Sequence, residues 1–246
     1  MTMAPAILAV VSGLCAALPG IALPLHAETF SPPEGCQLTL TVQMRQCQVA
    51  NHYTCAKDAP GDRWIAYADG SGVFFTSRID NETRWMESIS TETGEIDVLE
   101  DSAPDHASFS TLLATDRDDY DFYTLNNLGE RRRYTGHDLL TGEQVVIDGT
   151  PLERASFDLS SYDATGAFVS RRYGSQYVSR ELRIFFSDTE SFENAYGDKV
   201  TTSQPPAAFA RPGDKDFGAA EPVFDCDMLM TDAQPTPTRP ALLRRH

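Results

Sequence analysis

Short runs of alternating apolar and polar residues, each bounded by a turn signal, most constrain how this chain folds. Alternation places successive side chains on opposite faces of a strand. Asp69-Gly70 is a strong hairpin signal because both residues accept a positive φ. Turn signals recur about every 8–12 residues without a long helical pattern between them. The runs that we expect to form strands are 37–44, 62–68, 73–79, 83–89, 95–99, 131–135, 144–147, 153–162, 167–173, 176–179 and 181–186.

This pattern predicts a mainly β protein, an antiparallel meander that forms a barrel, a half-barrel or a sandwich. One or two short helices are expected, at 108–115, which has one apolar side, and at 190–195. Other segments look like loops. Thr141-Gly142 reads as a turn, and the expected loops are 48–54 between two cysteines, the acidic 116–121 and the Pro/Ala-rich 204–212.

The first 27 residues contain no Asp, Glu, Lys or Arg, and they run from an apolar core to a small residue, Ala27. This is typical of a secretory signal peptide, although a positive N-terminal region is missing. An uncleaved anchor or an ordinary apolar N-terminus is one alternative. Lipidation of Cys15 is another, which the bulky Leu14 before it disfavours. We predict a signal peptide over 1–27, a single β-rich domain over 28–230 and a disordered Pro-rich tail over 231–246.

The formal net charge is −16, and all of it follows residue 27. Such an acidic surface repels phosphate backbones, so the sequence predicts no nucleic-acid partner. No later stretch approaches about 18 apolar residues, so we expect no transmembrane span. The predicted location is the periplasm or the extracellular space.

After the expected cleavage four cysteines remain, Cys36, Cys47, Cys55 and Cys226. An even number in an exported chain predicts two disulfides, and three pairings are possible. The pairing we prefer is Cys47–Cys55, closing a small loop, with Cys36–Cys226 tying the C-terminal part to the first strand. Zinc at Cys47, His52 and Cys55 is the rival interpretation, and their spacing fits no common zinc pattern. We therefore predict no metal and no other cofactor.

The sequence contains no nucleophile elbow, zinc-protease helix, Walker loop or dinucleotide turn. His52, His106 and His137 are expected in polar loops, and His246 falls in the tail. The acidic segment 116–121 invites a calcium interpretation. It fails the EF-hand template, however, and a solvated loop is the better interpretation. The sequence leaves open whether the protein is an enzyme and favours a non-catalytic role.

Arginines and aromatic residues supply the candidate ligand site. If neighbouring strands pair, guanidinium groups converge on one sheet face and suit an anionic group. The alternative is cross-strand pairing with acids such as Asp158, which contributes little. Aromatic side chains either fill the core or line a ligand cavity of a half-open sheet. The candidate ligand-binding residues are Arg131, Arg133, Arg171, Arg172, Trp64 and Trp85.

Three hypotheses of function follow. The leading one is an exported non-catalytic protein that binds a small or apolar ligand, or a partner, on a curved β-sheet. The second is a secreted hydrolase with a carboxylate- or His-centred site. The third is a structural protein that interacts with other envelope proteins, for which an exposed sheet edge is expected.

Overall fold

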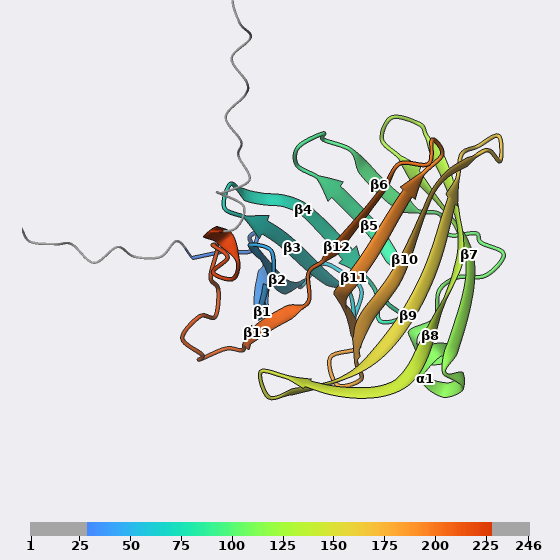
Figure 1. Ribbon diagram of the computed structural model, residues 1–246. Helices are drawn as coiled ribbons and strands as arrows, with labels where there is room; N and C mark the ends of the chain where they lie inside the picture. The colour runs from blue at the N-terminus through green and yellow to red at the C-terminus, as the bar shows by residue number, and fades with distance from the viewer. Residues whose placement is uncertain (1–28, 228–246) are drawn as a thin grey trace, which may run out of the picture.

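A computed structural model describes residues 29–227, which form one antiparallel sheet of 13 strands and one short helix (Figure 1). The mainly β prediction is confirmed. The expected signal peptide over 1–27 and the tail over 231–246 lie outside the described residues. The elements are β1 (Cys36–Met44), β2 (Gln48–Cys55), β3 (Arg63–Asp69), β4 (Gly72–Ile79), β5 (Trp85–Ser90), β6 (Ile96–Leu99), α1 (Phe109–Thr115), β7 (Arg117–Asn126), β8 (Arg131–Ile147), β9 (Thr150–Tyr162), β10 (Phe168–Ser179), β11 (Ile184–Asn194), β12 (Lys199–Ser203) and β13 (Pro206–Ala210).

The sheet is a meander from β1 to β12 in which each strand pairs with the next, and β13 then pairs with β1. Two residues, Gln204 and Pro205, join the two edge strands β12 and β13. The amide of Gln204 donates to the carbonyl of Asp188 in β11, and the amide of Arg45 donates to the carbonyl of Pro205. The connector therefore lies between the two edges of the sheet, which curves into a half-barrel without closing (Figure 1).

Two glycines allow neighbouring strands to approach closely within the curved part of the sheet. A Cβ atom on Gly136 of β8 would lie 2.0 Å from the carbonyl oxygen of Asp158 in β9. A Cβ atom on Gly174 of β10 would lie equally close to the carbonyl oxygen of Thr189 in β11. Glycine inside a strand typically marks such a bend or close backbone contact.

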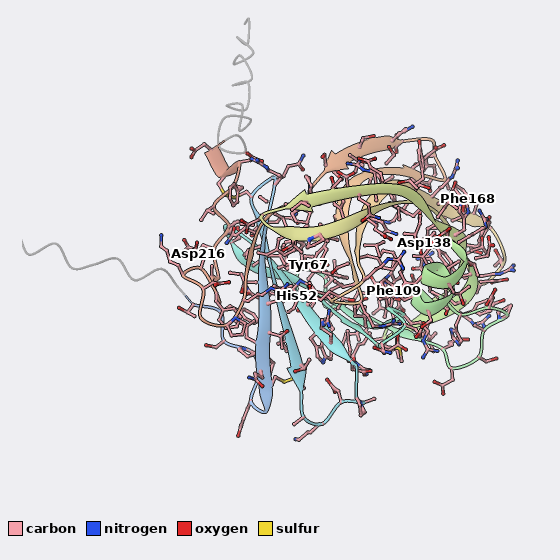
Figure 2. All side chains as sticks on the ribbon, turned by 90° about the horizontal axis from the view of Figure 1, so that it is seen from below. His52, Tyr67, Phe109, Asp138, Phe168 and Asp216 are labelled. Carbon is pink, nitrogen blue, oxygen red and sulfur yellow. A yellow bond between two sulfur atoms is a disulfide. The ribbon has the colours of Figure 1, made fainter. Side chains whose placement is uncertain are left out.

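The concave side of the sheet carries the core. The largest cluster centres on Val42, Ile65 and Phe186, and a second is built around Tyr120 and Phe122. The helix α1 packs against β7 and β8, at the lower end of these strands in Figure 1. Phe109, the first residue of α1, is 1% exposed and is labelled at the helix in the view from below (Figure 2).

The helix predicted over 108–115 is confirmed, since Ser108 caps α1 by accepting a hydrogen bond from the amide of Thr111. The helical turn predicted over 190–195 is wrong, because β11 extends to Asn194 between β10 and β12. The turn predicted at Thr141-Gly142 lies inside β8 instead. There Gly142 has a φ of 78° within a register shift between Leu140 and Gln144.

Three segments expected as loops form strands. Residues 48–54 lie in β2, residues 117–121 begin β7, and the segment 204–212 contains β13. All three take part in sheet pairing, which satisfies their backbone donors and acceptors whatever the polarity of their side chains. Pairing with neighbouring strands therefore makes these segments strands, although their local composition predicts loops.

Both disulfides exist, but the preferred pairing is wrong: the bonds are Cys36–Cys55 and Cys47–Cys226. The cause is the missed strand β2. Antiparallel pairing with β1 places Cys55 directly opposite Cys36 and leaves Cys47 at the far end, in the β1–β2 turn. There the Cys47 amide donates to the carbonyl of Phe224 over 2.8 Å, which brings Cys226 within reach.

With these cysteines in disulfides, the described residues contain no group of three or more His, Cys, Asp or Glu side chains placed to hold a metal ion. No helix between residues 29 and 227 is long and apolar enough to cross a membrane. Two disulfides are consistent with a periplasmic or extracellular protein.

Candidate ligand-binding cavity

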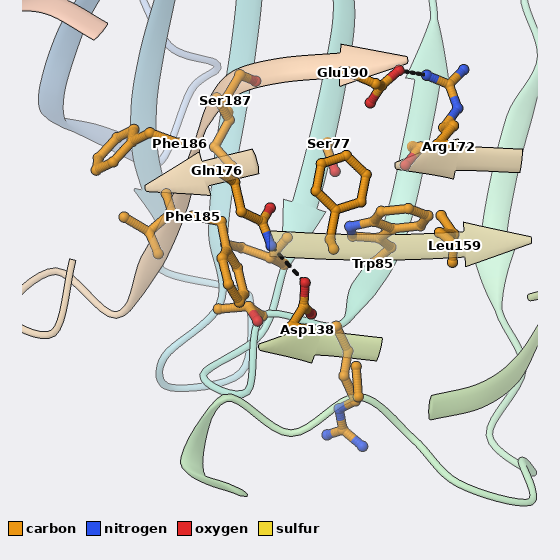
Figure 3. A pocket seen from close by; sticks show the side chains of 18 of the residues that line it. Ser77, Trp85, Asp138, Leu159, Arg172, Gln176, Phe185, Phe186, Ser187 and Glu190 are labelled. Atoms are coloured by element: carbon orange, nitrogen blue, oxygen red, sulfur yellow. Dashed lines mark hydrogen bonds and ion pairs between the residues drawn. The ribbon is translucent and has the colours of Figure 1, made fainter. Parts of the chain in front are cut away.

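A cavity of about 660 Å³ lies in the concave side of the half-barrel (Figure 3). Every strand from β2 to β12 contributes to its lining, so segments far apart in the sequence form one site. Its aromatic lining includes Trp85, Phe122, Tyr134, Phe157, Phe185 and Phe186.

One wall of the cavity is a cluster of three rings from three strands. Phe122 of β7 and Tyr134 of β8 stack with ring centroids 5.3 Å apart. Trp85 of β5 meets both edge-on, at 6.0 Å and 5.9 Å. Trp85 is nevertheless 43% exposed, so a large apolar surface remains open towards the cavity and solvent.

The adjacent Phe185 and Phe186 of β11 both line the cavity although they point to opposite faces of their strand. Phe185 packs edge-on against Phe109 of α1, and Phe186 packs edge-on against Phe209 of β13, each with centroids 5.3 Å apart. The helix on one side and the edge strand on the other therefore cover both rings.

The polar centre of the cavity is Asp138 of β8. Its Oδ1 accepts a hydrogen bond from Nε2 of Gln176 in β10 over 2.6 Å, and the residue is 9% exposed (Figure 3). Burial, together with the nearby charge of Asp118, raises the pKa of Asp138 to about 7. Asp138 is thus an acid whose protonation changes near neutral pH.

Asp118 lies directly opposite Asp138 in the β7–β8 pair. Its Oδ2 accepts a hydrogen bond from the amide of Ser108 over 2.7 Å, so it anchors the start of α1 and does not line the cavity. Burial also raises the pKa of Asp118, to about 6. Two carboxyl groups on facing strands resist simultaneous ionisation in this buried region.

The other charged groups of the lining are mostly paired. Arg172 forms an ion pair with Glu190, and both are partly exposed. Asp188 accepts from Arg154 and from Ser175, each over 2.7 Å. In contrast, Asp97 and Asp138 of the lining form no ion pair with any residue between 29 and 227, and of these two only Asp138 is buried. Asp138 therefore combines a deep position with a free carboxyl oxygen.

The structure places two of the six candidate ligand residues, Trp85 and Arg172, in the cavity lining. Trp64 stacks with Tyr53 and donates to Asp58, away from the cavity. The remaining three arginines form ion pairs on partly exposed surface, as the cross-strand alternative expects: Arg131 with Glu100, Arg133 with Asp121 and Arg171 with Asp158.

The histidines differ from the polar-loop expectation at two positions. His52 is buried in β2, with neither ring nitrogen hydrogen-bonded to a described residue. His137 lies in β8, where Asp119 and Asp158 are its register partners. His106 lines the cavity from a loop, and its Nε2 lies 3.1 Å from the carbonyl oxygen of Asp101.

Sequence reasoning missed Asp138, Gln176 and Phe122 as site residues. A signal was present in β8, where Tyr134, Gly136 and Asp138 share one face with the buried Leu140. An acid on the apolar face of a strand is unusual and draws attention to a site.

No protein-family model, no curated protein and no solved structure matches this chain. The case for a function therefore depends on the geometry of the cavity.

Proposed function

We propose that this is an exported, non-catalytic protein that binds a small, mainly apolar ligand in the concave side of its half-barrel. The observation that carries the proposal is the cavity of about 660 Å³ with an aromatic lining. Ligand pockets commonly have volumes of about 300–1,000 Å³ and combine apolar walls with a few polar groups.

The polar pair of Asp138 and Gln176 supports a ligand with one polar end. The aromatic cluster of Trp85, Phe122 and Tyr134 offers contact to an apolar body, while the free oxygen of Asp138 offers a hydrogen bond to a polar group. Binding of an apolar ligand would remove the surfaces of these rings from water. The favourable free energy is roughly 25 cal/mol per Å² of apolar surface buried.

The hydrolase hypothesis is less well supported. A carboxylate-centred site needs a second acid or a nucleophile beside Asp138, and Asp118 is committed to the amide of Ser108 outside the lining. A His-centred site needs a base within hydrogen-bond reach of an acid or nucleophile. Among the described residues, His106 contacts only a backbone carbonyl.

The chain contains two tryptophans, and only one of them lines the cavity, which makes fluorescence a direct test. In a Trp64→Phe variant, the emission reports Trp85 alone. We expect the neutral apolar probe N-phenyl-1-naphthylamine to bind saturably, with its own fluorescence excited by energy transfer from Trp85.

The matched control is Trp85→Phe, in which Trp64 is the remaining donor. It should bind with weaker affinity and show less energy transfer than Trp64→Phe. Circular dichroism confirms that each variant is folded. Non-saturable binding, or identical transfer from both tryptophans, would show that the cavity does not take up apolar molecules.

A further inference from the structure

A second, smaller pocket lies beside β1, β2 and β3, between the β10–β11 turn and the segment that follows β13. Its volume is about 170 Å³, and its polar lining comes from Thr39, His52, Arg63 and Arg211. It shares no lining residue with the larger cavity. The ring of His52 contacts Phe186, which lines the larger cavity, with centroids 6.0 Å apart.

His52 is the first unusual feature of this pocket. The residue is 2% exposed, and neither Nδ1 nor Nε2 has a hydrogen-bond partner in residues 29–227. Leaving a buried polar group unpaired costs about 1–3 kcal/mol, and native proteins rarely do so. A ring that lines a pocket in this state points to a group inside the pocket.

Arg63 is the second unusual feature of this pocket. Every other arginine between residues 29 and 227 forms an ion pair with a carboxylate. Arg63 forms none, and its described hydrogen bond runs from Nη1 to the carbonyl oxygen of Leu182 over 2.9 Å. In a chain of net charge −16, an arginine without an acid is the exception.

The surroundings leave this positive charge uncompensated. Arg211 also lines the pocket, but its ion pair with Glu181 neutralises it. Burial, together with the charge of Arg63, lowers the pKa of His52 to about 3. His52 is therefore neutral at pH 7 and presents one N–H donor and one acceptor beside the guanidinium of Arg63.

We propose that this pocket binds a small oxyanion, phosphate or carboxylate, held by the guanidinium of Arg63 and by the ring N–H of His52. The planar guanidinium donates to two oxygens of such an anion at once. A water molecule occupies about 30 Å³ of liquid volume, so the pocket admits an oxyanion in place of a few waters and excludes larger apolar ligands.

The experiment follows the imidazole signals of His52 by nuclear magnetic resonance during titration with inorganic phosphate, acetate and chloride at constant ionic strength. We expect saturable shifts at His52 with phosphate or with acetate, and none with chloride. If phosphate saturates the His52 shifts at a lower concentration than acetate, the pocket prefers a phosphate group; the reverse order indicates a carboxylate. The bound anion also offsets the charge of Arg63, so the pKa of His52 should rise on binding.

Arg63→Gln removes the positive charge and should weaken binding at least tenfold, measured by isothermal titration calorimetry. Arg45→Gln is the matched control, because it removes an arginine that pairs with Asp225 away from this pocket and should leave the affinity unchanged. The proposal is overturned if neither oxyanion shifts the His52 signals of the wild-type protein. Equal weakening by both substitutions would overturn it too, because the effect would then be general electrostatics.

Discussion

Replacing Asp138 with asparagine should stabilise the protein at neutral and alkaline pH and leave it nearly unchanged at pH 4. Asparagine keeps the shape of the side chain, and its Oδ1 can still accept the hydrogen bond from Gln176. The substitution therefore removes the ionisable group with little change in packing.

The magnitude follows from the pKa of Asp138, which burial raises from 3.8 to about 7 in the folded protein. The unfolded chain releases this proton from about pH 4 upward, while the folded protein holds it until about pH 7. Between these limits the unfolded state binds fewer protons, so the free energy of unfolding falls as pH rises. At about 1.4 kcal/mol per pKa unit, the total loss is on the order of 4 kcal/mol.

Urea unfolding followed by circular dichroism at a series of pH values measures this difference. The wild type and Asp138→Asn should have similar free energies of unfolding at pH 4. The difference between these free energies should grow up to about pH 7 and then stay constant. Because the pKa of Asp118, about 6, lies below that of Asp138, Asp138 is still mostly neutral when Asp118 ionises, and the substitution should leave the pKa of Asp118 nearly unchanged.

Asp158→Asn is the control, because Asp158 forms an ion pair with Arg171 on partly exposed surface and its pKa is lowered by that contact. Its replacement should slightly destabilise the protein above pH 4, which is the opposite sign. A pH profile of Asp138→Asn that runs parallel to the wild type from pH 4 to 8 would refute the assignment of Asp138 as a buried acid.

Two further substitutions test the curvature and the core. Gly136→Ala should lower the free energy of unfolding by about 2–3 kcal/mol in urea titrations, because its Cβ would lie 2.0 Å from the Asp158 carbonyl. Gly70→Ala, which meets no atom within 4 Å, should leave stability within about 1 kcal/mol of the wild type, and equal effects would contradict the close approach. Phe109→Ala should cost about 3–5 kcal/mol, because the ring is 1% exposed. Phe168→Ala, at a ring 40% exposed, should cost less than about 1 kcal/mol in thermal unfolding, and a reversed order would contradict the role of α1 in the core.

The strands that sequence reasoning missed have physical features in common. In β7, acids occur on both faces: Asp118 beside Tyr120 on the buried face, and Asp119 beside Asp121 on the other. The hydrophobic alternation is therefore masked, although the strand is well paired. In β2, the buried positions include the polar Asn51 and His52, which local hydrophobicity assigns to a loop.

Only part of the cavity lining was within reach of the sequence. Trp85 and Arg172 were candidates and line the cavity, because an aromatic or basic residue on a predicted strand has an even chance of facing inward. Asp138 and Gln176 were out of reach as a pair, because they are 38 residues apart on strands separated by β9. Only the register of β8, β9 and β10 brings them together.

The sequence by itself determined the antiparallel β class, one short helix and the presence of disulfide-bonded cysteines. These depend on local patterns, namely alternation, turn signals, an N-cap and cysteine count. The tertiary structure decided which cysteines pair, which acid loses contact with water and where the sheet encloses a cavity. All three depend on strand register and sheet curvature, which join residues far apart in the chain and which no short stretch of sequence encodes.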